Sequence, residues 1–187
     1  MKTILWVLIA AVLAACSILP KPAPPPVLHD FGPPASAPAA AVPVEVSVSA
    51  PLWLDDTAIY YRLMYSDPTQ LRAYADHRWL APPAQLLQAR LRGAFANRSP
   101  HYRLEVQLLD FEQVFDTAQS AHISLRAQAS LRDLSSGTAI GERMFAVTQS
   151  TSPDVQGAVS GDAQAANELL ARLEQWVHTQ LAPDKSP

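Results

Sequence analysis

The sequence predicts an α+β domain: a mixed, largely antiparallel sheet with two helices packed on one face, in the order βββα-βββα. Three observations favour this fold. Several segments alternate apolar and polar residues with a period of two, which is typical of strands with one buried face. Two segments instead repeat apolar residues at helical spacing. Each of these two follows a group of three predicted strands, so the element order repeats although the residues do not.

The first group of strands opens the folded domain. Residues 44–52 alternate apolar and polar side chains, which indicates a half-buried strand. A turn at residues 55–56 separates it from residues 58–65 (AIYYRLMY), whose aromatic and β-branched side chains indicate a second strand. Residues 70–74 predict a short third strand.

The second group of strands is longer. Residues 102–115 predict a strand whose alternation shifts near Asp110, which indicates a β-bulge. Residues 122–133 alternate without interruption and predict the next strand. A hairpin turn at residues 135–137 then leads into a third strand at residues 140–151.

One helix is expected after each group of strands. The first opens at Pro82-Pro83, because proline suits a first helical turn, and it ends at residues 97–100. The second is long and runs from Pro153 to Leu181. Their apolar stripes are Leu87, Leu91 and Phe95 in the first helix, and Val159, Ala163, Ala166, Leu170, Leu173 and Val177 in the second.

The N-terminus predicts export. Lys2 precedes an apolar run from Ile4 to Leu13, and small residues follow before Cys16, the only cysteine of the chain. This pattern is typical of a secretory signal peptide, which we place at residues 1–15. An ordinary signal peptide with an incidental cysteine and a signal anchor are the alternatives. No second run of eighteen apolar residues follows, so nothing else is expected to span a membrane.

Residues 16–43 are predicted to tether the domain, which we place at residues 44–182 before a flexible tail at 183–187. Residues 20–43 hold nine prolines, a composition that favours extended polyproline II over a packed core. At about 3.1 Å per residue, such a segment reaches roughly 70 Å. Residues 27–32 contain less proline, and we expect a short strand there that docks on the domain.

Composition and motifs argue against catalysis and nucleic-acid binding. The chain has 14 Lys+Arg, 17 Asp+Glu and no basic patch, so no nucleic-acid partner is expected. Nucleotide-binding and nucleophile motifs are absent, and we predict neither an enzyme nor a cofactor. The clustered Asp110, Glu112 and Asp116 fit a charged hairpin end better than acid–base chemistry. No metal site is expected, because the five histidines are scattered without metal-ligand spacing: His29, His77, His101, His122 and His178.

One segment combines aromatic residues with arginines, as binding surfaces do. The candidate partner-binding residues are Tyr60, Arg62, Arg78 and Trp79. For Trp79 and Tyr61, packing in the core is the favoured alternative, because a tryptophan before a helix commonly fills the gap between helix and sheet. The two arginines are expected to be exposed, or paired with Asp76 or Asp55.

Leu13-Ala14-Ala15-Cys16 resembles the lipobox of bacterial lipoproteins. The resemblance implies cleavage before Cys16, attachment of a diacylglyceryl group to its thiol and acylation of the new amino terminus by a fatty acid such as palmitate. Ser17 is not the aspartate linked to inner-membrane retention, so the resemblance implies the periplasmic face of the outer membrane.

The domain resembles the ABC-type transport auxiliary lipoprotein component family, which includes the PqiC-like outer-membrane lipoproteins. The resemblance rests on residues 46–54, 59–62, 74–79 and 83–87, and it spans roughly residues 27–181. The lead segment begins with His29, where relatives often have a tyrosine. The family supplies no catalytic residues.

The resemblance implies a docking subunit for a transporter made of an ATPase, a permease and a periplasmic MCE-type protein that carries lipid between membranes. The expected partners are therefore that MCE-type protein, its permease and ATPase, and the outer membrane through acyl chains on Cys16. Two alternatives stay open: a domain that itself binds phospholipid in a groove beside the final helix, and a structural lipoprotein of envelope assembly. An envelope hydrolase is opposed by the motif search.

Overall fold

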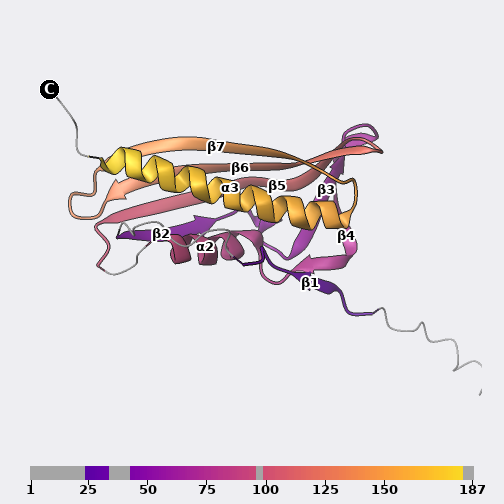
Figure 1. The fold of residues 1–187 in the computed structure, drawn as a ribbon, viewed down its shortest axis with the longest axis horizontal. Coiled ribbons are helices and arrows are strands. Elements are labelled where there is room, and N and C mark those ends of the chain that lie inside the picture. The colour runs from indigo at the N-terminus through magenta and orange to yellow at the C-terminus, as the bar shows by residue number, and fades with distance from the viewer. Residues whose placement is uncertain (1–23, 34–42, 96–98, 183–187) are drawn as a thin grey trace, which may run out of the picture.

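A computed structural model describes residues 24–33, 43–95 and 99–182 (Figure 1). Within these residues the fold is α+β, and the predicted βββα-βββα order is confirmed, with one more strand in front. The strands are β1 (Val27–His29), β2 (Val44–Ser49), β3 (Ala58–Leu63), β4 (Asp67–Trp79), β5 (Tyr102–Thr117), β6 (Ser120–Asp133) and β7 (Ala139–Thr151). The helices are the 3₁₀ helix η2 (Leu52–Leu54) and the α-helices α2 (Pro83–Ala94) and α3 (Val155–Leu181).

In the described chain the strands form one seven-stranded mixed sheet in the order β1-β4-β3-β5-β6-β7, with β2 also paired to β5. The long ladders β5–β6 and β6–β7 are antiparallel, as is β3–β4. The ladders β1–β4, β2–β5 and β3–β5 are parallel. The docked strand expected within residues 27–32 is confirmed as β1, which pairs with the end of β4.

Strand β5 contains the predicted bulge. Its pairing with β6 shifts register between Leu108 and Asp110. Before the shift, residues such as Leu104 and Leu108 are buried and alternate with exposed ones. After it, every residue from Phe111 to Phe115 is buried, so both faces of the strand are covered. The bulge therefore separates a half-exposed part of β5 from a fully enclosed part.

Two predicted strand lengths are wrong. The strand expected at residues 70–74 is much longer, because β4 runs from Asp67 to Trp79. Most of its first residues are exposed and polar, so the segment lacks the alternation that reveals a strand. Its backbone is held by pairing with β3. Conversely, the strand expected at residues 44–52 stops at Ser49, and Pro51 leads into the 3₁₀ helix.

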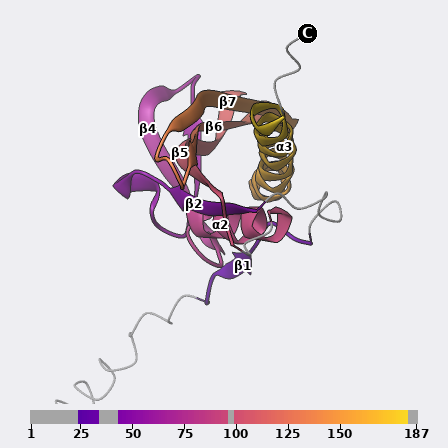
Figure 2. The same cartoon turned by 90° about the vertical axis from the view of Figure 1, so that its left-hand side faces the viewer.

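Both α-helices bury one face in a common core on one face of the sheet. Of the stripe predicted for α3, Ala166, Leu173 and Val177 are buried, whereas Val159, Ala163 and Leu170 are only partly buried. Helix α3 packs along β5, β6 and β7, and α2 packs on β2. Figure 2 shows the sheet curving around this helical layer. Both helices contribute fully buried side chains to the core: Leu87 and Leu91 from α2, and Leu169, Leu173 and Val177 from α3. None of the helices that the structure describes is long and apolar enough to cross a membrane.

The first turns of α3 lie very close to the end of β7. A Cβ atom added at Gly157 would lie 2.0 Å from the carbonyl oxygen of Ser152. One added at Gly161 would lie 2.3 Å from Cγ2 of Thr151. Glycine is therefore required at these positions by the close approach of helix and strand rather than by backbone conformation.

Substituting Gly157→Ala should lower the free energy of unfolding by about 2 kcal/mol, because backbone atoms must shift to admit the methyl group. Gly93→Ala in α2 is the matched control, since nothing lies within 4 Å of its Cβ position. That change should raise stability by about 0.5 kcal/mol through helix propensity. Urea unfolding measures both. Equal effects of the two changes would contradict the close approach.

Helix α3 carries a carboxyl group on its buried face. Asp162 is buried, and its Oδ1 has no hydrogen-bond partner among the described residues. Burial raises the pKa of this carboxyl well above its usual value. The folded protein thus favours the neutral acid, whereas the unfolded chain ionises Asp162 above about pH 4. This group therefore costs stability as pH rises from about 4 toward its folded pKa.

Asp162→Asn removes this pH-dependent contribution to the free energy of unfolding. We expect the variant to gain stability over the wild type as pH rises above about 4, by at most about 1.4 kcal/mol per pH unit. Asp133→Asn should behave oppositely, because hydrogen bonds from Ser135 and Ser136 lower the pKa of Asp133 to about 2. That variant should lose stability against the wild type between about pH 2 and about pH 4, with a constant deficit above that range. Chemical unfolding across pH 4 to 8 checks Asp162, and a pH-independent difference would refute it.

Candidate partner-binding surface

The predicted partner-binding residues lie on β3 and at the end of β4, but they have different surroundings. Trp79 is 1% exposed. Its ring packs against Phe31, at 5.2 Å between centroids, and against Phe111, at 6.0 Å. The core interpretation of Trp79 is confirmed, and a contribution of Trp79 to binding would act through packing. Tyr61 is half-buried against Tyr74, at 4.7 Å between ring centroids.

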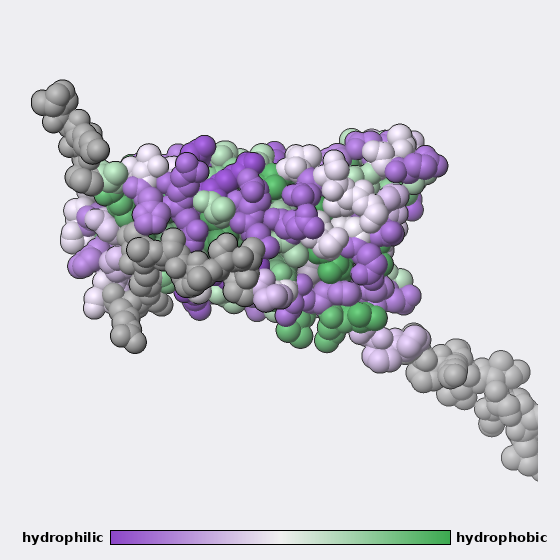
Figure 3. All heavy atoms as spheres, viewed as in Figure 1, coloured by the Kyte–Doolittle hydropathy of each residue, from purple (hydrophilic) through white to green (hydrophobic). Residues whose placement is uncertain are grey.

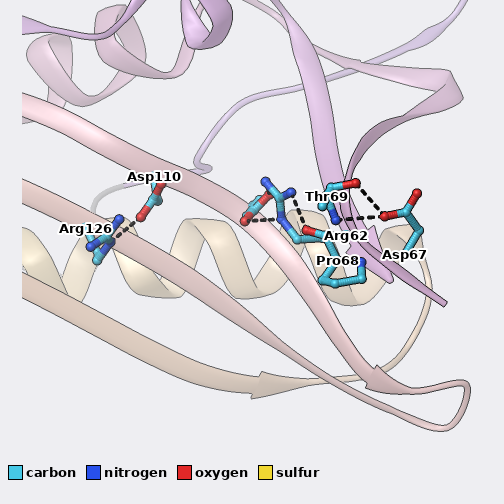
Figure 4. A network of polar contacts seen from close by, with 7 residues as sticks. Arg62, Asp67, Pro68, Thr69, Asp110 and Arg126 are labelled. Carbon is cyan, nitrogen blue, oxygen red and sulfur yellow. Dashed lines mark hydrogen bonds and ion pairs between the residues drawn. The ribbon is translucent and has the colours of Figure 1, made fainter. Parts of the chain in front are cut away.

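Arg62 forms a two-pronged ion pair with Glu112 of β5. Its Nε and Nη2 donate to the two carboxylate oxygens at 3.0 and 3.1 Å, and Nη1 donates to the carbonyl of Pro68 at 2.9 Å. Figure 4 shows Arg62 beside Pro68 in this network. The pairing predicted for Arg62 with Asp55 or Asp76 is wrong, because Glu112 is buried on the neighbouring strand and requires a cation. Arg62 thus joins β3, β4 and β5.

Arg78 also binds backbone rather than the predicted carboxylates. Its Nη1 donates to the carbonyls of Tyr74, Ala75 (3.2 Å) and His77 (2.7 Å). The predicted partners Asp55 and Asp76 are therefore wrong for this arginine as well. Its guanidinium group thus provides hydrogen bonds to backbone carbonyls near the end of β4, and the side chain stays partly accessible to solvent.

Tyr60 belongs to an accessible aromatic pair. Its hydroxyl donates to Oδ2 of Asp56 at 2.7 Å, and its ring meets Trp53 edge-on at 6.3 Å between centroids. Burial and the Asp56 carboxylate raise the pKa of Tyr60 to about 12. Trp53 is 42% exposed. Tyr60 and Trp53, with Arg78 nearby, are the part of the predicted segment that a partner can reach.

The segment before the domain is fastened to it by three contacts. β1 pairs with His77, Arg78 and Trp79, and the Phe31 ring enters the core. Arg90 of α2 donates to the carbonyls of Phe31 (2.8 Å) and Gly32. The reach of roughly 70 Å predicted for residues 20–43 is wrong, because that estimate assumed a continuous free chain.

Two histidines that are far apart in the sequence meet at β1. Nε2 of His29 and Nδ1 of His77 share a hydrogen bond of 2.8 Å, and the rings stack at 5.1 Å between centroids. Burial, followed by electrostatic repulsion from His77, lowers the pKa of His29, and Asp30 opposes this. An open hollow of about 300 Å³ lies beside them, lined by Leu28, His29, Asp30, Gly32 and Leu80.

The three clustered carboxylates do not form an acid–base pair. Asp110 binds Arg126, Glu112 binds Arg62, and Asp116 binds His122 at 2.9 Å. Figure 4 shows Asp110 and Arg126 at a separate place from the Arg62 network. Among residues 24–33, 43–95 and 99–182, no group of three or more His, Cys, Asp or Glu is placed to hold a metal ion.

An apolar cluster lies where the chain enters the domain. Val27 is 52%, Leu28 56% and Leu80 60% exposed. Leu80 adjoins β1, since its N–H donates to the carbonyl of His29 at 2.7 Å. Figure 3 shows hydrophobic atoms gathered at this edge of the molecule. We refer to Val27, Leu28 and Leu80 as the β1 cluster.

Comparison with known proteins adds the family. The family model described as ABC-type transport auxiliary lipoprotein component matches residues 27–174. The chain belongs to this family. The match includes β1, the four predicted binding residues and most of α3. As an auxiliary lipoprotein component, the protein is associated with ABC transport and with a membrane of the cell envelope.

Two solved structures with the same fold align with most of this chain. A protein from Xanthomonas campestris is 19% identical with a TM-score of 0.66, over 84% of this chain and 93% of that one. An uncharacterized protein is 15% identical with a TM-score of 0.64, over 82% and 99%. At these identities the likeness shows the fold alone. A search of curated proteins gave no match.

Sequence reasoning missed several accessible residues of this surface. Trp53 lies in a short apolar stretch that reads as the end of a strand, and only its place in a 3₁₀ helix exposes it. Leu28 and Leu80 stand in short segments near prolines and carry no periodic signal. The contact of His29 with His77 joins residues 48 positions apart, which no local pattern encodes.

Breaking the Arg62–Glu112 pair should destabilise the fold. We expect Arg62→Met to lower the free energy of unfolding by about 2 kcal/mol, because it leaves the Glu112 carboxylate buried without its cation. Adding Glu112→Gln should recover part of the loss. The control is Glu168→Gln in the exposed Arg172–Glu168 pair, which should cost at most about 0.5 kcal/mol. Equal losses for the two single changes, measured by urea unfolding, would argue against a structural role for Arg62.

Proposed function

We propose that this protein is a non-enzymatic outer-membrane lipoprotein subunit of an MCE-type ABC lipid transport system. In this role it docks the periplasmic MCE-type protein at the outer membrane. The match to the auxiliary lipoprotein family over residues 27–174 carries the proposal. The lipobox-like Leu13-Ala14-Ala15-Cys16 supports it independently.

The anchor follows from Cys16. In the proposal residues 1–15 are removed, and Cys16 becomes the lipidated N-terminus of the mature protein. One acyl chain holds a protein only marginally on a membrane, whereas two or more hold it stably. Three chains at Cys16 therefore give lasting attachment. Ser17 directs the product to the outer membrane, by likeness to sorted bacterial lipoproteins.

The docking role is supported by the arrangement of the accessible aromatic pair. Trp53 lies in the 3₁₀ helix η2 and Tyr60 lies on β3, which Arg62 fixes to β5. Exposed aromatic side chains on a rigid sheet are typical anchors of protein interfaces, because little side-chain freedom is lost on binding. We place contact with the MCE-type protein, and through it with the permease and ATPase, on this pair and Arg78.

A domain that itself holds phospholipid has less support. That alternative needs an open apolar groove beside the final helix. The apolar side chains that α3 turns toward the sheet, Leu169, Leu173 and Val177, are instead fully buried.

The proposal is tested by purifying the tagged, lipidated protein from crosslinked envelopes and identifying bound proteins and lipids by mass spectrometry. We expect an MCE-type protein together with its permease or ATPase. Recovery of only an outer-membrane barrel protein, or of lipid alone, would overturn the transporter role for this chain.

In the same experiment Trp53→Ser should reduce recovery of the MCE-type protein roughly tenfold, which corresponds to about 1.4 kcal/mol of binding free energy. Met144→Ser is the matched control, because Met144 is a comparably exposed apolar residue, 54% accessible, on β7. It should leave recovery unchanged. If both variants bind like the wild type, the partner contacts another surface.

A further inference from the structure

The β1 cluster is unusual in its position. Isolated exposed apolar residues are normal on soluble proteins, but adjoining ones at one edge indicate a contact surface. Leu28 and Leu80 line the same hollow, and Val27 precedes Leu28 on the opposite face of the edge strand β1. Each of the three side chains is more than half exposed. All three lie on the first described strand or beside it, next to the point where the N-terminal chain leaves the domain (Figures 1 and 3).

Few residues separate this cluster from the proposed lipid anchor. Only residues 17–23 lie between Cys16 and the described chain. Even fully extended, at about 3.5 Å per residue, the stretch from Cys16 to Pro24 spans about 28 Å. Since β1 is bound into the sheet, that length limits how far the β1 end of the domain can lie from the membrane.

The chemistry of the cluster suits a shallow membrane contact. Apolar side chains at the edge of a protein enter the boundary between lipid headgroups and acyl chains. Leu28 is paired with Arg78 across β1 and β4, but the guanidinium group of Arg78 donates to the carbonyls of Tyr74, Ala75 and His77. The apolar side chains therefore carry the proposed contact.

We propose that the β1 cluster rests on the bilayer in which the acyl chains of Cys16 are embedded. Leu28 and Leu80 enter the headgroup boundary, with Val27 beside them on the other face of the edge strand β1. The proposal rests on the lipid anchor of the proposed function. It adds an orientation, because the domain then lies with its β1 end on the membrane and with the β6–β7 turn directed away from it.

The single cysteine makes a clean test possible, because lipidation of Cys16 leaves no free thiol in the chain. The lipidated full-length protein carrying Leu80→Cys is labelled with an environment-sensitive fluorophore. It is then reconstituted into vesicles of phosphatidylethanolamine and phosphatidylglycerol that contain shallow doxyl-labelled lipid. The matched control carries Ser136→Cys in the exposed β6–β7 turn, which Figure 1 places at the opposite end of the long axis.

We expect doxyl lipid to quench the label at position 80 several-fold more than the label at position 136. Adding Val27→Ser and Leu28→Ser should reduce quenching at position 80 toward the control, with circular dichroism confirming that the fold is retained. Equal quenching at both positions in protein that floats with the vesicles would overturn the bilayer contact while leaving the anchor intact. Failure to float would overturn the proposed anchor, and the bilayer contact with it.

Discussion

Strand β5 is paired on both sides, and its bulge shapes the centre of the sheet. On one side it pairs with β6 along nearly its whole length, and on the other first with β2 and then with β3. Before the register shift between Leu108 and Asp110, the side chains of Leu104 and Leu108 face the helices. After the shift, Phe111, Gln113 and Phe115 face them instead. Residues after the shift are enclosed on both faces, so the polar ones need partners. Gln113 obtains them from Tyr74, Thr151 and Ser152, and Glu112 from Arg62.

The sequence predicts those parts of the fold that are encoded by local periodicity. Uninterrupted alternation revealed β6, the break in alternation at Asp110 revealed the bulge, and helical spacing revealed α3. What it could not predict depends on distant pairing. β4 is mostly exposed and is held by its neighbours, so its length has no signature in its own side chains. The partners of Arg62 and His29 lie 50 and 48 residues away, and charge alone favoured nearer carboxylates.

The edge strands of the sheet differ in how well their unpaired backbone groups are protected. Gln88 of α2 accepts a hydrogen bond from the backbone N–H of Val48 in β2, and Arg172 of α3 donates to the carbonyl of Ala146 in the edge strand β7. Such contacts occupy backbone groups that would otherwise template pairing with another chain. On the side away from β3, β4 is paired in the described chain only at His77, Arg78 and Trp79, by the short β1. The part of β4 before His77 is therefore the least protected edge of the sheet in the described chain.

The fastening of β1 has a mechanical consequence. Any tension that reaches the domain through its N-terminus is applied first to the three-residue ladder of β1 with β4. After the ladder, the chain is held by the buried Phe31 ring and by the hydrogen bonds that Arg90 donates to the Phe31 and Gly32 carbonyls. These contacts transmit force from the N-terminal segment to α2 and to the centre of the sheet. Pulling on the N-terminus would separate β1 from the sheet before it unfolded the rest, so this segment sets the force of the first rupture.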